Sequence, residues 1–315
     1  MFSLPMGCPG SAGGAPLHEG RVRPATLKGY KRVLLDFLSW ARVTGMVISD
    51  PESLDDACVV YAELRRVGRS AFSKLLAAIL FFMPRMHGHL WAARATLIGW
   101  SRLEPTQHTT PMLRVFVLAL AVRLSAMGYP ELGSGVLLGH TLLLRPSELI
   151  GLKVSDITLP EHAPTTGASR LFVSLGPTPW GTKVNRRQVV STVDVFAAAA
   201  ARALVRRATA AGRVQLLPAC YETFRRRFRD ACAALGWGAS GFAPHSLRAG
   251  GATQMLMNGR PFEDIQAAGR WAAAQSCKVY LDGVYALAAA TTAQARPFLP
   301  LLSLRTLPPE LGSVA

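Results

Sequence analysis

The stretch "APHSLRAGGATQML" (residues 243–256) is the most informative about the fold, because it contains a helix start with two side chains that are rich in hydrogen-bond donors. Pro244 stands before the helix, and an Asn-Gly pair that ends at Gly259 is typical of a helix C-terminus. His245 and Arg248 are three residues apart, so they share one helical face. The small Ala and Gly residues that follow let another backbone or a ligand come close. The stretch therefore predicts a short helix with an anionic group beside its first turn. Taken alone, a capping histidine and an exposed arginine are the slightly better interpretation of His245 and Arg248.

The stretch "RPSELIGLKVSDI" (residues 145–157) has the same features. Pro146 suits the first position of a helix, which places Arg145 at the N-cap and Glu148 at the third position, from which it can turn back. The free N–H groups of a helix start favour a phosphate, and the guanidinium of Arg145 adds a planar fork of donors. Taken alone, an ordinary surface arginine paired with Glu148 is the simpler interpretation.

The charge of the chain points to an acidic partner. The 315 residues are 50% hydrophobic, which excludes a disordered protein and allows two modest domains. Lys and Arg number 35 against 19 Asp and Glu, so the formal net charge is +16. Surplus arginine from a GC-rich genome explains part of this composition. Nucleic acid or an anionic membrane surface are the leading partners for so basic a surface.

The cysteines and apolar runs limit the class of protein further. Five cysteines are scattered without a C-x-x-C pair, so neither a structural zinc site nor a disulfide framework is expected. The first twenty residues lack the basic and apolar segments of a secretory signal. The longest apolar runs are shorter than the ~18–20 residues that span a bilayer. We expect a soluble, intracellular protein without a bound metal or a membrane segment.

Composition divides the chain into a helical domain and a mixed domain. The parts are a Gly/Pro-rich tail (1–20), a four-helix domain (21–103), a linker with two prolines (104–111), a second domain (112–295) and an extended tail (296–315). In the second domain we expect a first helix from Met112, capped by Thr110 and Pro111. Strands are expected over 152–159, 170–175 and 186–193, and helices after them. The fold class is mainly α, with a small antiparallel sheet.

The stretch "RPFEDIQAAGRWAAAQSCKVYLDG" (residues 260–283) adds two aromatic residues near the end of this domain. Pro261 starts a helix that Gly269 ends, and Trp271 follows at once. A short helix then carries Tyr280. Either aromatic residue, taken in isolation, reads as part of the core.

The order of these features resembles the tyrosine recombinase (phage integrase) family. That family has an arginine box, a His-x-x-Arg box, a His or Trp and a tyrosine in this order, which here are Arg145 with Glu148, His245 with Arg248, Trp271 and Tyr280. "HSLRAGGAT" and "IQAAGRW" are similar to the Cre-like and retrotransposon-borne branches. The motifs lie within residues 111–290, and over 21–103 the resemblance is one of architecture to a helical core-binding domain that clamps DNA.

The resemblance implies an enzyme that breaks and rejoins DNA without a metal or other cofactor. Arg145 and Arg248 would grip the non-bridging oxygens of a phosphate, and His245 and Trp271 would donate to the same oxygens. Tyr280 would be the nucleophile and would form a 3′-phosphotyrosyl link. Tyr285 is the alternative nucleophile, but it points about 140° away on the same helix and fits the spacing from Trp271 less well.

A hairpin lysine supplies the proton to the leaving oxygen in this family. Lys183 is the only lysine of the expected hairpin, but it follows a long "GPTPWG" insertion, and the upstream lysine of many relatives is absent. A solvated loop lysine is the other interpretation. Arg186 and Arg187 beside it, and Arg225 and Arg229 on one face of "ETFRRRFRDA", are candidate phosphate contacts. A solvated basic face remains open for these arginines too.

The family further implies double-stranded DNA as the partner and a tetramer on two duplexes, each protomer lending its C-terminal helix to a neighbour. Docking of that helix on its own domain is an equal alternative. The leading function is site-specific recombination or element integration. A type IB topoisomerase-like enzyme and a domesticated DNA-binding protein that has lost catalysis are the alternatives. The protein would act where DNA is, in a nucleus or a bacterial cytoplasm.

Overall fold

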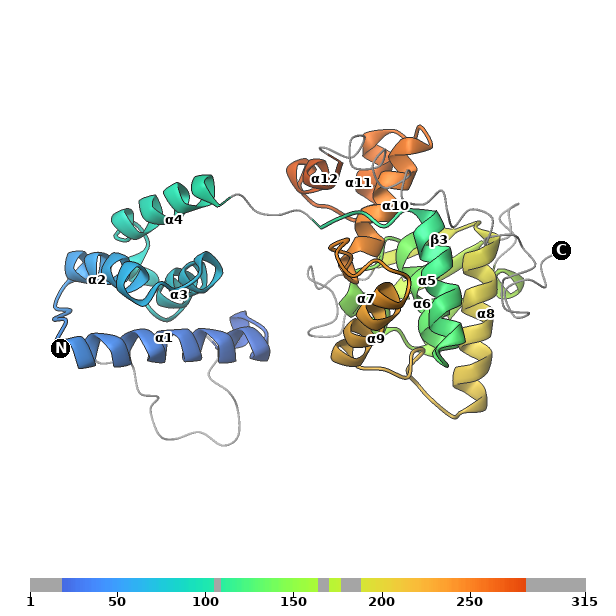
Figure 1. Cartoon of the computed structure of the whole chain (residues 1–315), viewed down its shortest axis with the longest axis horizontal. Coiled ribbons are helices and arrows are strands. Elements are labelled where there is room, and N and C mark those ends of the chain that lie inside the picture. Colours follow the sequence, from blue (N-terminus) through green and yellow to red (C-terminus); the bar gives the residue numbers. More distant parts are fainter. Residues whose placement is uncertain (1–18, 105–108, 164–169, 177–187, 282–315) are drawn as a thin grey trace. The chain divides into compact units, whose positions relative to one another are not determined.

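The computed structural model describes residues 19–104, 109–163, 170–176 and 188–281, which form two compact units (Figure 1). The first unit is Met1–Gln107 and the second is His108–Ala315, so the division falls inside the expected linker 104–111. Along the described parts of the chain, no helix has the length and apolarity needed to cross a membrane.

The described residues of the first unit contain four α-helices, the number expected for residues 21–103. They are α1 (Pro24–Thr44), α2 (Pro51–Arg65), α3 (Arg69–Phe82) and α4 (Trp91–Leu103), with the short turns η1 (Glu19–Arg21) and η2 (Pro84–Met86). Asp50 caps α2, because its carboxylate accepts from the Ser53 N–H at 2.8 Å and the Ser53 hydroxyl accepts from the Asp50 N–H at 3.1 Å. Asp55 of α2 is buried and accepts from the first N–H groups of α4, at Ala92 and Ala93, over 2.7 and 2.9 Å. The caps therefore fix where α2 and α4 begin.

The second unit is mainly helical with one small sheet. Its helices are α5 (Arg114–Ala126), α6 (Pro130–Thr141), α7 (Pro146–Gly151), α8 (Val195–Ala210), α9 (Tyr221–Ala234), α10 (His245–Met257), α11 (Phe262–Gly269) and α12 (Ala274–Leu281). The strands β1 (Ile157–Thr158), β2 (Leu171–Leu175) and β3 (Gln188–Thr192) pair antiparallel in that order, with Val173 opposite both Ile157 and Val190. Buried Leu171, Val173 and Leu175 alternate along β2 and face the core. The predicted fold class is confirmed.

The predicted start of the first helix in this unit is wrong. Helix α5 begins at Arg114, not behind a cap at Thr110 and Pro111. The reason is tertiary, because Met112 is fully buried and its N–H donates to the Ser246 carbonyl of α10 at 3.0 Å. That bond holds the chain extended where a local pattern favours a helix.

The first predicted strand, over 152–159, is also shorter than expected, since only Ile157–Thr158 joins the sheet. Residues Val154–Asp156 form the turn η3 instead, in which the Asp156 carboxylate accepts from the Lys153 N–H at 2.9 Å. The backbone before this turn pairs with another segment, because the Leu216 N–H donates to the Leu152 carbonyl at 2.8 Å. The stretch is therefore divided between two pairings, that of Leu152 with Leu216 and that of Ile157–Thr158 with the sheet.

The small residues of α10 let two other backbones approach it. A Cβ on Gly250 would lie 1.8 Å from the Met112 carbonyl oxygen, and a Cβ on Gly251 would lie 2.2 Å from that of His140. No side chain fits at these separations. The neighbour that the Gly-Gly pair accommodates is therefore protein backbone, which places α10 against the segment before α5 and the end of α6.

We expect Gly250→Ala to lower the free energy of unfolding by about 3 kcal/mol, because the new methyl group forces backbone apart. Calorimetric melting of the full chain measures this. Gly99→Ala is the matched control, because Gly99 lies in α4 with nothing within 4 Å of its Cβ position. That change should raise stability by up to about 1 kcal/mol through helix propensity. Equal melting temperatures for the two variants would contradict the close approach at Gly250.

Candidate active site

The candidate site lies where α7, α10, α11 and α12 meet in the second unit. Helix α10 contacts α6, α11 and α12, and α11 also contacts α12. Figure 1 shows α10, α11 and α12 as neighbouring orange helices. The turn between α6 and α7 completes the group, because the Leu143 carbonyl in it accepts hydrogen bonds from two arginines. These elements bring together motifs that stand more than a hundred residues apart in the sequence.

Arg145 and Glu148 adopt the local arrangement that the sequence predicts. Arg145 is the N-cap of α7, and its N–H donates to Glu148 Oε2 at 2.8 Å. Its guanidinium Nη1 donates to Glu148 Oε1 at 2.6 Å. The Glu148 side chain is 2% exposed and that of Arg145 is 19% exposed, so the carboxylate is buried and the guanidinium reaches solvent. Because α7 has only six residues, a phosphate contact here depends on the guanidinium more than on a helix dipole.

Arg248 is buried more deeply than a helix-start arginine suggests. It is 1% exposed, and its Nη1 donates to the Leu143 carbonyl at 2.6 Å, while its Nη2 donates to the Gly269 carbonyl. Its guanidinium also lies over the ring of Trp271, 4.3 Å from the ring centre. These contacts fix the plane of the guanidinium and tie α10 to the α6–α7 turn and to the end of α11.

His245 begins α10 and is half-buried. Burial, followed by the positive charges of Arg248 and Arg145, holds the pKa of His245 below its usual range, and the charge of Glu148 opposes this. The lowered pKa favours a neutral imidazole at pH 7, which has one N–H donor and one acceptor. The same interactions place His245 within electrostatic range of both arginines.

Trp271 packs in a small apolar cluster that also contains Leu143, Ala252, Ile265 and Cys277. Its ring covers Gly269, where a Cβ would lie 1.6 Å from a ring carbon, so only glycine fits there. The cluster explains the spacing of the Gly-x-Trp motif, since a glycine two residues earlier makes room for the indole. Trp271 is thus both a core residue and the face on which Arg248 lies.

Tyr280 lies in α12, one turn after Cys277. Cys277 is fully buried, and burial raises the pKa of its thiol while the charge of Arg248 lowers it. Helix α12 also contacts α10, the helix that carries Arg248. Lys183, Arg186, Arg187 and Tyr285 lie outside the described residues, as does the segment after Leu281.

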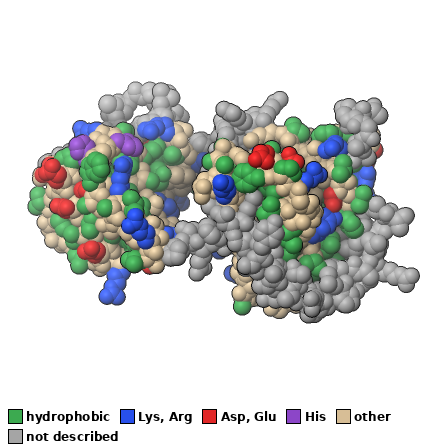
Figure 2. Space-filling model, turned by 90° about the horizontal axis from the view of Figure 1, so that it is seen from above, with side chains coloured by type: hydrophobic (Ala, Val, Ile, Leu, Met, Phe, Trp, Pro, Cys, Tyr) green, Lys and Arg blue, Asp and Glu red, His purple; other side chains and the backbone are tan. Residues whose placement is uncertain are grey.

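Helix α9 separates its aromatic and basic residues as predicted. Phe224 and Phe228 are buried, whereas Arg225 and Arg229 are exposed. Arg227, also in α9, stacks over the ring of Tyr129 at 4.6 Å. The view from above in Figure 2 shows Lys and Arg side chains at separate places on both units, with acidic side chains among them. Because Arg225 and Arg229 are exposed, both are available for phosphate contact.

Arg270 is the site residue that sequence reasoning missed. Its side chain is 6% exposed, and its Nη2 donates to Glu148 Oε2 at 2.7 Å. Its backbone is left-handed, with φ of 58°, because α11 ends there. Burial lowers the pKa of Arg270, and the charge of Glu148 opposes this effect. The signal in the sequence was an arginine directly before Trp271, but this pattern does not distinguish a site residue from an ordinary surface arginine.

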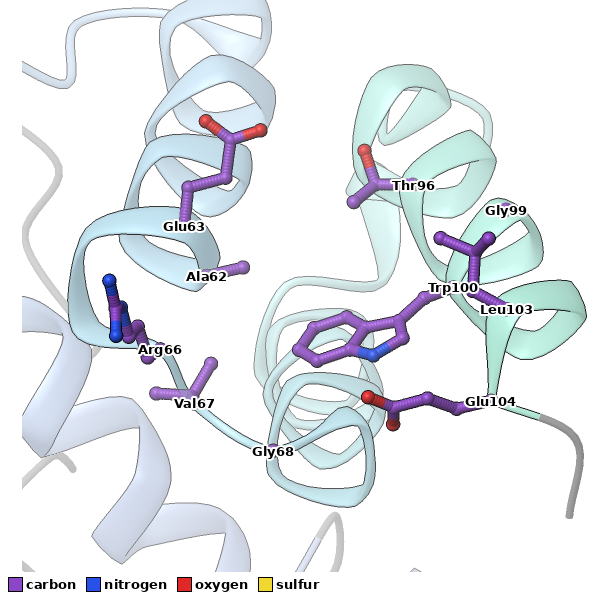
Figure 3. Close-up of a pocket in the computed structure, with 10 residues that line it drawn as sticks. All are labelled: Ala62, Glu63, Arg66, Val67, Gly68, Thr96, Gly99, Trp100, Leu103 and Glu104. Carbon is purple, nitrogen blue, oxygen red and sulfur yellow. The ribbon is translucent and has the colours of Figure 1, made fainter.

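The first unit has a pocket of about 680 Å³ at the ends of α2 and α4 and the start of α3 (Figure 3). It is lined by Ala62, Glu63, Arg66, Val67, Gly68, Thr96, Gly99, Trp100, Leu103 and Glu104. The Trp100 ring extends toward Val67, with the Glu104 carboxylate beside it. None of the predicted site residues lines this pocket. The described ranges also contain no group of three or more His, Cys, Asp or Glu residues that could hold a metal ion.

Comparison with known proteins relates the chain to one family. The family model described as "Phage integrase family" matches residues 136–285. No curated protein sequence matches the chain. Among solved structures, the chain is similar to the XerH site-specific recombinase bound to palindromic difH substrate in a post-cleavage complex, with a TM-score of 0.57 and 13% identity over 81% of this chain and 76% of that one.

Two further solved structures have the same fold. A lambda integrase fragment, in a dimer bound to a COC′ core site, matches with a TM-score of 0.53 and 16% identity over 82% of this chain and 89% of that one. The Tn1549 transposon integrase in complex with transposon right end DNA matches with a TM-score of 0.54 and 15% identity over 84% and 91%. At these identities the structural matches establish the shared fold.

Proposed function

We propose, on the premise that residues 136–285 are a domain of the phage integrase family, that the chain is a site-specific recombinase or integrase. It would cut and rejoin DNA through a 3′-phosphotyrosyl intermediate. The observation that carries the proposal is the gathering of Arg145, Glu148 and Arg248 around His245, where Arg145 pairs with the buried Glu148 carboxylate and all three charges act on the imidazole. The proposal is further supported by the three similar structures, a recombinase and two integrases, each of which is bound to its DNA site.

The arginines supply the charge that the reaction needs. Phosphodiester cleavage builds negative charge on the non-bridging oxygens, and preorganised cations stabilise it best where water is excluded. Arg145 is partly exposed and offers its remaining N–H groups to those oxygens. Arg248 donates to the Leu143 and Gly269 carbonyls, and these hydrogen bonds fix its guanidinium. Its positive charge would therefore stay close to the non-bridging oxygens of the bound phosphate.

His245 and Trp271 would add hydrogen bonds rather than charge. The lowered pKa of His245 keeps its imidazole neutral at pH 7, so it donates a single N–H. The indole of Trp271 has one N–H donor and no acceptor, which suits an oxygen of the phosphate. Both roles are proposals that follow from the order of the motifs.

Tyr280 would attack the phosphorus. An ordinary phenol has a pKa near 10, so nearby positive charge must favour its anion, and the phenolic proton passes to water as the Oη–P bond forms. The bond from phosphorus to the 5′-oxygen breaks, and that oxygen takes a proton from a general acid, for which we propose Lys183. The released 5′-hydroxyl of a partner strand can reverse the step, so rejoining needs no outside energy source.

DNA is the proposed partner, as a duplex that both units contact. We propose the first unit as the core-binding domain, and Arg186, Arg187, Arg225 and Arg229 as phosphate contacts of the second. A tetramer on two duplexes, with the segment after Tyr280 exchanged between protomers, completes the proposal. We also propose that the chain belongs to the Cre-like or retrotransposon-type branch, on the strength of "HSLRAGGAT" and "IQAAGRW".

The experiment that tests the function uses a nicked suicide duplex made from inverted repeats that flank the coding region. We expect the full chain to form a covalent adduct that survives denaturing electrophoresis. Binding without an adduct would favour a DNA-binding protein that has lost catalysis. Relaxation of supercoiled plasmid without strand exchange between two duplexes would favour the topoisomerase-like alternative.

A further inference from the structure

We propose that Arg270 is a positioning residue that holds Glu148, and through it Arg145, ready for the phosphate; this inference rests on the proposed function. The Glu148 carboxylate lies between the two guanidiniums. Its Oε1 accepts from Arg145 Nη1 at 2.6 Å, and its Oε2 accepts from Arg270 Nη2 at 2.7 Å. The same Oε2 accepts from the Arg145 N–H at 2.8 Å. Arg270 thus fixes the carboxylate that fixes Arg145.

Arg270 is itself anchored at the turn that also anchors Arg248. Its guanidinium donates to the Leu142 carbonyl at 3.5 Å and to the Leu143 carbonyl at 3.3 Å. The Leu143 carbonyl accepts from Arg248 as well, at 2.6 Å. One carbonyl oxygen therefore links the two phosphate-binding arginines through Arg270. A small displacement of Arg270 would move both.

The backbone at these positions supports a functional constraint. Leu143 and Arg270 both have left-handed backbones, with φ of 49° and 58°. Residues with side chains rarely adopt this conformation, and they keep it where the surrounding structure demands it. Here it lets the Leu143 carbonyl accept from the Arg270 guanidinium, while that guanidinium donates to the Glu148 carboxylate of α7. The Nε of Arg270 is buried and has no hydrogen-bond partner among the described residues. An unpaired buried donor costs free energy, so the reason for an arginine at this position is its contact with Glu148 rather than complete hydrogen bonding.

The net charge of Arg145, Glu148 and Arg270 explains why position 270 needs a cationic side chain. Glu148 paired with Arg145 alone would cancel the charge that a phosphate must meet. A second buried guanidinium leaves the group of Arg145, Glu148 and Arg270 with a net positive charge. It also saturates one face of the carboxylate, so Arg145 is oriented by Glu148 without being neutralised by it.

The test compares Arg270→Gln and Arg270→Lys in single-turnover adduct formation on the suicide duplex. With saturating DNA, we expect Arg270→Gln to slow the reaction roughly 10- to 100-fold, as a misplaced catalytic group does, while Kd for DNA changes less than about threefold. Arg270→Lys should recover part of the rate, because an ammonium can still pair with Glu148. Arg260→Gln is the matched control, since Arg260 is 64% exposed and approaches Asp264 only at 3.9 Å.

The double variant Glu148→Gln/Arg270→Gln separates positioning from a merely structural role. If Arg270 acts through Glu148, the double variant should cleave no more slowly than the slower single variant. Rate losses that multiply, or an Arg270→Gln variant as fast as Arg260→Gln, would overturn the inference while leaving the proposed function intact. Absence of an adduct from the unmodified chain would overturn both. If Arg270→Gln fails to fold, Arg270→Lys and Glu148→Gln give the same comparison.

Discussion

Replacing Tyr280 with Phe is expected to abolish the covalent protein–DNA adduct, with a loss of cleavage of about 10⁴-fold or more. The substitution removes one hydroxyl and leaves the ring, so the residual rate reflects a site without its nucleophile. Helix α12, which carries Tyr280, packs against α10, so its backbone position should be unchanged. DNA binding, measured by fluorescence anisotropy, should remain within about threefold of the unmodified chain.

Tyr285→Phe is the matched control for this prediction. The two tyrosines are five residues apart, and on one continuous helix they would point about 140° from each other. Only one of them can reach a phosphate between Arg145 and Arg248. We expect Tyr285→Phe to keep the adduct on the same nicked duplex. Adduct that persists in Tyr280→Phe and disappears in Tyr285→Phe would assign the nucleophile to the later turn.

Arg248→Ala is expected to lose cleavage and stability together. Removing one preorganised donor from a developing oxyanion costs about 10²- to 10³-fold in rate. The structure adds a second cost, because the Leu143 and Gly269 carbonyls lose a buried donor and Trp271 loses the guanidinium over its ring. We expect the free energy of unfolding to fall by about 3 kcal/mol, as when buried polar groups are left unpaired. Denaturant melts and adduct kinetics on the same preparation measure both effects.

Arg145→Ala is expected to separate the loss of cleavage from the loss of stability. Its side chain is 19% exposed and its described side-chain hydrogen bond goes to Glu148, so we expect a similar loss of cleavage with a loss of stability below about 1.5 kcal/mol. From the sequence alone the two arginines are equivalent, and only their burial distinguishes them. If Arg248→Ala does not fold, Arg248→Lys keeps the charge and loses the fork. Equal stability losses at the two positions would contradict the structural roles given to them.

Local patterns in the sequence predicted the helix starts at the site correctly. Arg145, Pro146 and Glu148 form their cap within four positions, and α10 begins at His245 directly after Pro244. Such caps depend on residues within one turn of each other, so sequence order contains them. The prediction of where α5 begins was wrong because that start depends on a distant residue: the Met112 N–H donates to the Ser246 carbonyl, far along the chain.

The sequence by itself determined the mainly helical fold, the order of the arginine, His-x-x-Arg, tryptophan and tyrosine motifs, and the pairing of Arg145 with Glu148. Only the tertiary structure decided that Arg270 reaches Glu148 across 122 positions and that Arg248 donates to Leu143 across 105. Those contacts require the start of α10 and the end of α11 to lie at the turn between α6 and α7. Packing of this kind is set by the close approach of backbones at Gly250 and Gly251 and by the indole over Gly269. No local periodicity specifies which distant carboxylate or carbonyl a buried guanidinium will meet.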